Sequence, residues 1–467
     1  MVLYQEYQEK LPNMQINDVF EVQIEKMLYE GKALARFDGF PIFIDGGCPG
    51  DILKICIKKI NKSYAIADII EIVKSSEFRI KPKCALHSVC GSCGWQYIQY
   101  DEQLRQKQNI VFETLKKITG NEYQIKDIIP SPKQFEYRCK IQLPVEQKKV
   151  SKRLTSGYYK KNSHELVNIK YCPLQMSIIS EITEFIKLEA QKVGLSGYDE
   201  KLHKGILRHI IFRHDAQLSQ ILLIFVLNSN KVDDKVKQIS DIVLSKYPII
   251  KGICANYNTA KSNVIMGRNT QIISGNDYYI ETLSDKQYKI NANSFFQVNP
   301  YCAVKIFDKV KELIADKIKK PLILDAYSGV SSFGIWLSDI AKKVVCVEEV
   351  ESASNDAIYN VKINNADNIE ILNGDAEIRF DDLIKRGVKF DVSLIDPPRK
   401  GCSEDALNNL VKLTEKYIVY VSCNVTTLAR DMNILKEHGF TAIYIQPADM
   451  FPQTYHIETI VMFERNI

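Results

Sequence analysis

The sequence predicts an α/β protein with a parallel sheet in its C-terminal part and a small β-barrel at its N-terminus. From Asn291 onward, short apolar runs alternate with stretches of helical periodicity. Such alternation is typical of a parallel sheet with helices on its faces. Between Met14 and about Val73, five short runs of alternating apolar and polar residues are separated by turns that contain glycine. That pattern indicates a small barrel.

Composition places the chain among globular proteins of two or three domains. It has 467 residues, of which 45% are hydrophobic and 25% charged, and this length exceeds one ordinary core. No apolar run approaches the length of a membrane span, and residues 1–6 lack a basic region followed by an apolar stretch. We therefore expect a cytoplasmic protein with no membrane partner. The net charge of +5 is too modest to indicate nucleic acid by itself.

The N-terminal part begins with a polar extension, residues 1–13, and continues as the predicted barrel over residues 14–74. The five strands are expected at residues 19–24, 33–37, 41–44, 51–60 and 64–73. Short strands with glycine-containing turns suggest a barrel of the OB type, and such barrels often bind oligonucleotides. A small β domain with a purely structural role would show the same pattern.

Cysteines cluster at the start of the central region, which we place at residues 75–290. Three of the twelve cysteines in the chain fall within ten residues, and they are Cys84, Cys90 and Cys93. Cys172, which precedes Pro173, is the best candidate for a fourth ligand. Four thiolates can hold zinc or an iron–sulfur cluster, and the spacing leaves both open. The alternative is a set of unrelated buried cysteines, since the cytosol disfavours a disulfide framework.

The rest of the central region mixes predicted helices and strands. Helices are expected at residues 101–119, closed by Gly120, and at 176–193, and strands at 140–145 and 220–226. The same region offers basic side chains as candidate RNA contacts, although surface ion pairs would explain them equally. These candidates are Arg138, Arg208, His209, Arg213 and His214.

In the C-terminal part, residues 291–467, several predicted strands end in a carboxylate. The strands are expected at residues 322–326, 344–348, 369–373, 390–395, 417–422 and 457–463. In an open α/β sheet, ligands bind at the carboxyl ends of the strands. Four acids occupy this edge, and they are Asp325, Glu348, Asp375 and Asp396. Glu348 is placed as ribose-binding acids are in nucleotide folds.

The charge of this edge indicates which ligand it suits. A tight turn with Gly329 leads from the first strand into a helix, which lets the backbone approach a ligand. The chain has no P-loop lysine pattern, so a triphosphate is not expected. Several acids would repel a pyrophosphate and would suit an adenosine that carries a cationic sulfonium. We therefore predict S-adenosylmethionine as the cofactor.

A thiol and another carboxylate belong to the same region. Cys423 follows the apolar run 417–420, and Glu458 lies in the run 457–463. A structural cysteine and an edge-strand glutamate are the alternatives for each residue alone, as a helix-capping role is for Asp396. Together the three residues indicate a catalytic site.

Four sequence blocks in this order resemble the signature blocks of the RNA uracil-5-methyltransferases. They are NSFFQVN at 293–299, DPPRKG at 396–401, VSCN at 421–424 with LARD at 428–431, and MFPQT at 450–454 before Glu458. The barrel, with EGKA at 30–33 and DGF at 38–40, resembles the TRAM domain of RNA-modifying enzymes. The resemblance implies a Rossmann-like S-adenosylmethionine-dependent methyltransferase domain at 291–467, a TRAM barrel that delivers RNA, and a central α+β iron–sulfur domain.

The resemblance also implies roles for individual residues. Cys423 would be the nucleophile and Glu458 the general base. The methyl-donor pocket would be lined by Gln297, Tyr327, Ser332, Glu348, Asp375 and Asp396, and a 4Fe-4S cluster would be held by Cys84, Cys90, Cys93 and Cys172. Such a reaction needs a thiol and a base, because carbon 5 of uracil is a poor nucleophile until a thiolate adds to carbon 6. A base must then remove the carbon 5 proton.

Two features bear on how well such a site would work. The target base must leave its stack, and we expect Phe295 and Phe296 to help hold it. The turn at 328–331 reads SGVS where the family has Cys-Gly-x-Gly, so Ser331 replaces a glycine and we expect an effect on cofactor binding. Val425 replaces a commoner proline at the strand exit, a change that we expect to be tolerated.

The sequence therefore predicts a monomeric enzyme that forms 5-methyluridine in 23S rRNA, with transfer RNA as the second candidate substrate. Ribosomal RNA is favoured because the resemblance to the bacterial rRNA enzymes includes the barrel. A non-catalytic RNA-binding protein with a decayed methyltransferase domain would have no need to keep both Cys423 and Glu458. A redox protein that uses the cluster would bind flavin or nicotinamide and would not need Cys423 either.

Overall fold

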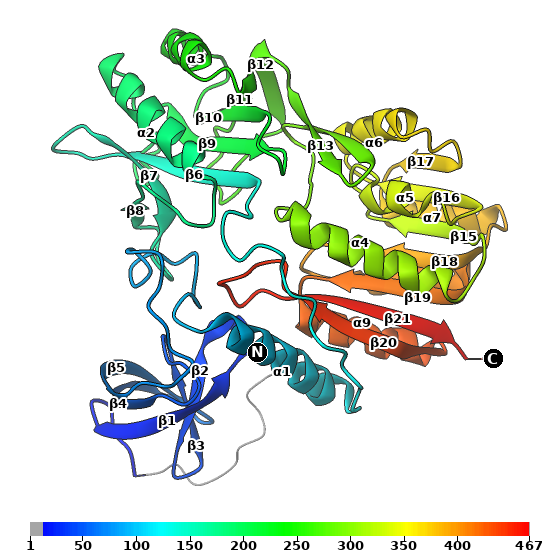
Figure 1. Ribbon diagram of the computed structural model, residues 1–467, viewed down its shortest axis with the longest axis horizontal. Helices are drawn as coiled ribbons and strands as arrows, with labels where there is room; N and C mark the ends of the chain where they lie inside the picture. Colours follow the sequence, from blue (N-terminus) through cyan, green and yellow to red (C-terminus); the bar gives the residue numbers. More distant parts are fainter. Residues whose placement is uncertain (1–12, 467) are drawn as a thin grey trace.

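The N-terminal part of the chain is a closed five-stranded barrel (Figure 1). The computed structural model describes residues 13–466, so all but the last residue of the predicted N-terminal extension lies outside it. The strands follow the order β1-β2-β3-β5-β4 around the barrel. Their bounds are β1 Val19–Met27, β2 Ala33–Phe37, β3 Phe40–Ile44, β4 Ile52–Ile60 and β5 Ala65–Lys74. The predicted OB-type barrel is confirmed, with strand ends shifted by at most three residues.

The central part is built on a seven-stranded sheet in the order β12-β11-β10-β9-β6-β7-β8. Its strands are β6 Lys140–Gln147, β7 Leu154–Tyr159, β8 Leu166–Asn168, β9 Leu207–His214, β10 Ile221–Leu227, β11 Ile250–Tyr257 and β12 Asn269–Gly275. Helices α2 (Ser177–Lys192) and α3 (Asp234–Lys246) pack on one face. Alternate residues of β10, among them Leu222 and Ile224, face the core shared with the C-terminal part. Strand β10 is therefore apolar throughout, because both of its faces are buried.

The C-terminal part holds a second seven-stranded sheet, in the order β17-β16-β15-β18-β19-β21-β20. Its strands are β15 Leu322–Ala326, β16 Lys343–Glu348, β17 Ile369–Asn373, β18 Phe390–Ile395, β19 Thr414–Ser422, β20 Phe440–Ala448 and β21 Glu458–Arg465. One face is covered by α4 (Pro300–Ala315), α5 (Ser332–Leu337) and α6 (Glu351–Ile363). The other is covered by α7 (Ala376–Lys385), α8 (Glu404–Leu413) and α9 (Val425–Glu437). This helix-covered sheet confirms the predicted α/β domain at the C-terminal end of the chain.

The prediction of a wholly parallel sheet is wrong at one edge. Strand β21 runs antiparallel to both β19 and β20, and β20 was not predicted. The loop 449–457 joins β20 to β21 without a crossover helix, and a direct connection of this kind joins antiparallel neighbours. As a result, the first residues of β21 lie beside the last residues of β19, and Thr459 pairs with Ser422.

The three parts are joined by segments that are distant in sequence. Helix α1 (Tyr100–Thr119) ends at Gly120, which has the left-handed φ of 70° expected of a C-cap, and it packs along α9. A hairpin of β13 (Tyr278–Leu283) and β14 (Lys286–Asn291) lies between the central sheet and α6. In Figure 1 the loop 449–457, drawn in red, extends from β20 and β21 toward the barrel and the central part. Among residues 13–466, no helix is long and apolar enough to cross a membrane.

Candidate active site and cysteine pocket

The thiol and two of the predicted carboxylates meet at the carboxyl edge of the C-terminal sheet. Asp396 directly follows β18, Cys423 directly follows β19, and Glu458 opens β21. Because β21 is antiparallel, its first residue is at the same edge as the last residues of its parallel neighbours. The three side chains are close enough to affect one another's ionisation. The structure therefore brings together the three residues that the sequence singled out as a catalytic site.

Burial disfavours ionisation of all three groups. Desolvation raises the pKa of Asp396 to about 7, although the residue as a whole is only half-buried. Desolvation and the neighbouring Asp396 raise the pKa of Glu458 well above its usual range. Desolvation, together with both carboxylates, raises the pKa of the Cys423 thiol to about 12, while the Arg399 guanidinium lowers it. Arg399 is one of the two cations of the DPPRKG block, and sequence analysis had assigned it no role.

The loop after Cys423 is fixed by the side chain of Asn424. Its Oδ1 accepts from the Thr426 backbone N–H at 3.0 Å and so caps α9. Its Nδ2 donates to the Arg399 carbonyl at 3.0 Å. The loop after Cys423 is thus tied to the loop that follows β18 and Asp396.

The residues expected to bind the methyl donor lie along neighbouring strand ends. Gln297 Nε2 donates to Asp396 Oδ2 at 3.3 Å. Glu348, at the end of β16, accepts from the backbone N–H groups of Gly329 and Val350, each at 2.8 Å. It therefore ties the turn after β15 to its own strand, and the two strands are adjacent in the sheet. A crevice outside adjacent strand ends is where open α/β sheets bind ligands.

The other three predicted donor-site residues differ in what they contact. Tyr327 opens the turn after β15 with a φ of 62°, and Ser332 is the first residue of α5. Asp375 is exposed, and its Oδ1 caps α7 by accepting from the backbone N–H groups of Glu377 and Ile378. At Asp375 a structural role is therefore visible beside the predicted binding role.

The turn before α5 keeps a left-handed conformation at the position where the family has glycine. Ser331 has φ 62° and ψ 39°, values that L-residues other than glycine seldom adopt. Its hydroxyl lies 3.1 Å from Cys346 Sγ in the next strand. At Gly334 a Cβ atom would stand 2.5 Å from both the Ser331 hydroxyl and Cys346 Sγ. Helix α5 therefore approaches the sheet closely at a glycine, as nucleotide-binding turns require.

Two sets of predicted RNA contacts are corrected by burial. Phe295 is 59% exposed and is free to stack, but Phe296 is 4% exposed and packs against Tyr288. Among the basic candidates, Arg138 and His209 are half-buried, and three are buried, namely Arg208, Arg213 and His214.

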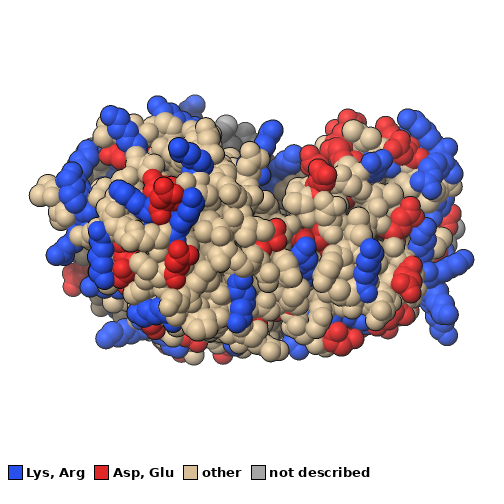
Figure 2. All heavy atoms as spheres, turned by 90° about the horizontal axis from the view of Figure 1, so that it is seen from above, with Lys and Arg blue, Asp and Glu red and all other residues tan. Residues whose placement is uncertain are grey.

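The buried basic residues hold backbone carbonyl groups and have a structural role. Arg208 donates to the carbonyls of Asn258 and Ala260, and Arg213 donates to that of Ser294. In Figure 2, lysine and arginine side chains are spread over the whole visible face with acidic side chains among them. That face offers no single basic patch to take the place of the buried residues.

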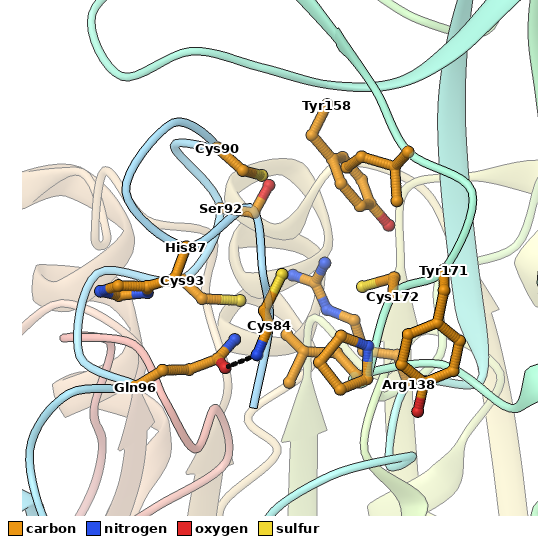
Figure 3. Close-up of a pocket in the computed structure, with 13 residues that line it drawn as sticks. Cys84, His87, Cys90, Ser92, Cys93, Gln96, Arg138, Tyr158, Tyr171 and Cys172 are labelled. Atoms are coloured by element: carbon orange, nitrogen blue, oxygen red, sulfur yellow. Dashed lines mark hydrogen bonds between the residues drawn. The ribbon is translucent and has the colours of Figure 1, made fainter. Parts of the chain in front are cut away.

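The four predicted metal ligands line one pocket between the barrel and the central sheet (Figure 3). Its empty space is about 360 Å³, including its mouth. In Figure 3 the thiols of Cys93 and Cys172 point toward each other, the Cys84 thiol points up between them, and Cys90 lies above them in the view. Within residues 13–466, however, no three His, Cys, Asp or Glu side chains are close enough to bind one metal ion. The described structure therefore does not by itself support an iron–sulfur domain.

Two other side chains of this pocket carry buried N–H groups. Gln96 Nε2 and Arg138 Nε are buried and make no hydrogen bond within residues 13–466. The Arg138 guanidinium also interacts electrostatically with the thiols of Cys93 and Cys172. A buried N–H without an acceptor costs about 1–3 kcal/mol. A group with several sulfur acceptors and a negative charge, such as an iron–sulfur cluster, would satisfy both donors.

Comparison with known families covers nearly the whole described chain. The model of the tRNA (uracil-5-)-methyltransferase family matches residues 99–466, and the TRAM domain model matches residues 14–70. A protein of Oceanobacillus iheyensis named as an uncharacterized RNA methyltransferase is 35% identical over 451 residues, which is 96% of this chain and 97% of that one. One of Clostridium acetobutylicum with the same description is 35% identical over 460 residues, 98% of this chain and 99% of that one.

A solved structure has the same fold over its full length. The Pyrococcus abyssi tRNA (uracil-54, C5)-methyltransferase, in complex with S-adenosyl-L-homocysteine, superposes with a TM-score of 0.73 and 28% identity. The match covers 95% of this chain and 100% of that one. The family matches, the helix-covered sheet and the N-terminal barrel agree with one another. The chain therefore belongs to the tRNA (uracil-5-)-methyltransferase family and is an S-adenosylmethionine-dependent RNA methyltransferase with a TRAM domain.

Proposed function

We propose that the chain methylates carbon 5 of a uridine in folded RNA, with Cys423 as the nucleophile and Glu458 as the general base. The observation that carries this proposal is the meeting of Cys423, Asp396 and Glu458 at one sheet edge, beside the turn at 327–331. One chain supplies all of these residues, which agrees with a monomeric enzyme.

The residues fit the order of steps that the reaction needs. The Cys423 sulfur forms a bond to carbon 6 of uracil, and a neighbouring carboxylate takes the thiol proton. The electron pair of the carbon 5–carbon 6 double bond would then form the bond to the methyl group, while the bond between that methyl group and the donor's sulfonium sulfur breaks and leaves its electron pair on the sulfur. Glu458 removes the carbon 5 proton, and the sulfur–carbon bond breaks to return the thiolate. A raised pKa makes the ionised Glu458 a stronger proton acceptor for this step.

The proposed donor site consists of the turn after β15 and the strand ends beside it. When bound, S-adenosylmethionine supplies an electrophilic methyl group. Glu348 would bind ribose hydroxyls, since acids at this position do so in nucleotide folds. Gln297 and Asp396, which share a hydrogen bond, would flank the reacting centre together with Tyr327. Ser332 and Asp375 would complete the rim.

For the substrate we propose 23S rRNA first, as the sequence predicts. The barrel carries less weight in this choice than expected, because the Pyrococcus abyssi enzyme named for transfer RNA aligns with 95% of this chain. That full-length similarity favours transfer RNA as the second candidate. Mass-spectrometric mapping of 5-methyluridine in both RNAs, from cells with and without the gene, decides between them.

The chemistry is tested with purified protein and RNA transcripts. We expect Cys423→Ala to abolish methylation with little loss of stability, because the thiol is at a half-buried strand end. Glu458→Gln should accumulate a covalent protein–RNA adduct, because addition and methyl transfer precede the step that needs the base. Cys254→Ala, a buried thiol in β11, is the control. Normal turnover by the Cys423 variant would contradict the mechanism. If the deletion strain keeps all of its 5-methyluridine, a non-catalytic RNA-binding role would be favoured.

We further propose that Cys84, Cys90, Cys93 and Cys172 hold a 4Fe-4S cluster. The support is the four-thiol lining of one pocket, the proline after Cys172, and the unsatisfied N–H groups of Gln96 and Arg138. When bound, the cluster would join the barrel side of the pocket to the central sheet. Anaerobically purified protein should contain about four iron and four sulfide ions per chain. Cys172→Ser should lose them while Cys254→Ser keeps them, and zinc in their place would contradict the proposal.

A further inference from the structure

The turn between barrel strands β1 and β2 reaches the catalytic edge of the C-terminal sheet. It contains the short 3-10 helix η2, Tyr29–Gly31. The Tyr29 hydroxyl donates to Asn424 Oδ1 at 2.9 Å, a contact between residues 395 positions apart in sequence. Asn424 directly follows the proposed nucleophile, Cys423. A barrel side chain is therefore one residue away from the reacting thiol.

The side chain of Asn424 makes two further hydrogen bonds, and both are within the C-terminal part. It accepts from the Thr426 N–H and donates to the Arg399 carbonyl, each at 3.0 Å. These two bonds set its amide plane but leave Oδ1 able to accept once more. The Tyr29 hydroxyl, which belongs to the barrel, donates this second hydrogen bond to Oδ1. Of the three hydrogen bonds made by the Asn424 side chain, only this one depends on how the barrel is docked.

The turn that contains Tyr29 has a backbone conformation that allows close contact with the C-terminal part. Glu30 has a left-handed φ of 69°, and Gly31 is buried with a φ of 82°. A Cβ at Gly31 would stand 2.7 Å from Cδ1 of the Tyr455 ring, so glycine is needed for the close approach. Tyr455 lies three residues before Glu458 in the sequence. The turn thus contacts both the loop that holds the nucleophile and the loop that leads to the base.

We propose that Tyr29 is a positioning residue for Cys423, acting through Asn424, so that the barrel takes part in the chemical step as well as in delivering RNA. The inference rests on the proposed function. The hydroxyl restrains the Asn424 amide, and this amide fixes the loop from which the Cys423 sulfur attacks. Without the hydroxyl, RNA would bind as before, but the thiol would reach carbon 6 of the base less often.

The experiment measures single-turnover formation of the Cys423 adduct on RNA that carries 5-fluorouridine at the target position. Fluorine cannot leave carbon 5 as a cation, so the adduct persists and can be counted. We expect Tyr29→Phe to slow adduct formation about tenfold, the effect of one lost positioning hydrogen bond. RNA affinity and melting temperature should stay near those of the wild type.

Tyr97→Phe is the matched control, because it removes another hydroxyl bound to the barrel, to the Gly47 carbonyl at 3.1 Å, without contact to Asn424. Asn424→Ala tests the route. If Tyr29 acts through Asn424, adding Tyr29→Phe to Asn424→Ala should cause no further slowing.

Several outcomes would overturn the inference while leaving the proposed function intact. They are a wild-type rate in Tyr29→Phe, equal slowing in Tyr97→Phe, additive slowing in the double variant, and a loss confined to RNA affinity. Absence of any adduct in the wild-type enzyme, on RNA that it methylates when uridine is present, would overturn the proposed nucleophile itself and the inference with it.

Discussion

Burial opposes ionisation of each side chain that the proposed reaction uses. The pKa of Asp396 is raised to about 7 and that of Cys423 to about 12, and Glu458 is shifted in the same direction. Three groups that each resist a negative charge in one small space cannot all be ionised together. Burial and the two carboxylates therefore favour the protonated form of the thiol. The cation of Arg399 is the nearby group that favours the thiolate.

The left-handed backbone conformation of Ser331 can be tested by substitution. We expect Ser331→Gly to raise the free energy of unfolding by about 1 kcal/mol, because glycine adopts the left-handed conformation without the Cβ clash. Ser331→Ala keeps the clash and loses the hydroxyl contact with Cys346, so it should be less stable than the wild type. Urea unfolding measures both variants.

Titration with S-adenosylhomocysteine shows whether the serine also weakens cofactor binding. If the wild type and Ser331→Gly bind S-adenosylhomocysteine equally well, the serine at position 331 affects stability alone. A Ser331→Gly variant that is less stable than the wild type would contradict the strain argument.

Among the elements, the hairpin of β20 and β21 and its loop 449–457 connect the catalytic edge to the rest of the molecule. Helix α1 holds this loop through Lys107, whose Nζ contacts Asp449 Oδ1 at 2.5 Å and the Phe451 carbonyl at 3.1 Å. Both side chains of this ion pair are fully buried. Gln103 of the same helix accepts from the Gln453 backbone N–H at 3.0 Å. The approach to Glu458 is therefore fixed by a helix that precedes it by more than three hundred residues.

The buried ion pair makes a prediction at this scale. Lys107→Met leaves the Asp449 carboxylate buried without its cation, and we expect it to destabilise the protein by about 3–5 kcal/mol. Adding Asp449→Asn removes the stranded charge and should recover part of that loss. Thermal and urea unfolding measure both variants. If the single and double variants are equally stable, Asp449 is not held as a charged partner.

For the whole molecule, the hairpin of β13 and β14 joins the central sheet to the catalytic domain. Glu281 of β13 accepts from the backbone N–H of Ala216, which follows β9. Burial, and the nearby Asp215, raise the pKa of Glu281 to about 8. The carboxyl in the folded protein therefore holds its proton at a pH where it would be ionised in the unfolded chain.

The stability of the whole chain should depend on pH through this group. Between an unfolded pKa of about 4.3 and the folded pKa of about 8, the folded state binds one more proton than the unfolded state. The contribution of Glu281 is thus fully present below the lower value and is lost as the pH rises through the higher one. The slope is at most about 1.4 kcal/mol per pH unit.

Glu281→Gln keeps an acceptor for Ala216 and cannot ionise, so it should flatten this slope. Urea unfolding between about pH 5 and about pH 8 compares the variant with the wild type. If stability depends on pH with the same slope in both proteins, a group other than Glu281 is responsible for that dependence.

The amino-acid sequence alone was sufficient to predict those features of the fold that depend on local residue patterns. The barrel strands, α1 with its Gly120 cap, and the strands from β15 to β19 were predicted because alternation, helical spacing and glycine turns are properties of neighbouring residues. Strand β20 was missed because it is an edge strand with half-exposed residues and contains Pro447, which is tolerated only at edges and bulges.

By itself, the sequence determined the fold class, the family and the set of candidate reacting groups, because these depend on residue types in a fixed order. Only the tertiary structure decided which residues share a site. It showed that β21 is antiparallel, which brings Glu458 to Cys423, and that Arg208 and Arg213 are buried against carbonyl groups instead of facing RNA. It also brought Tyr29 to Asn424. Such contacts join residues far apart in the chain, and they follow from packing, which no local pattern records.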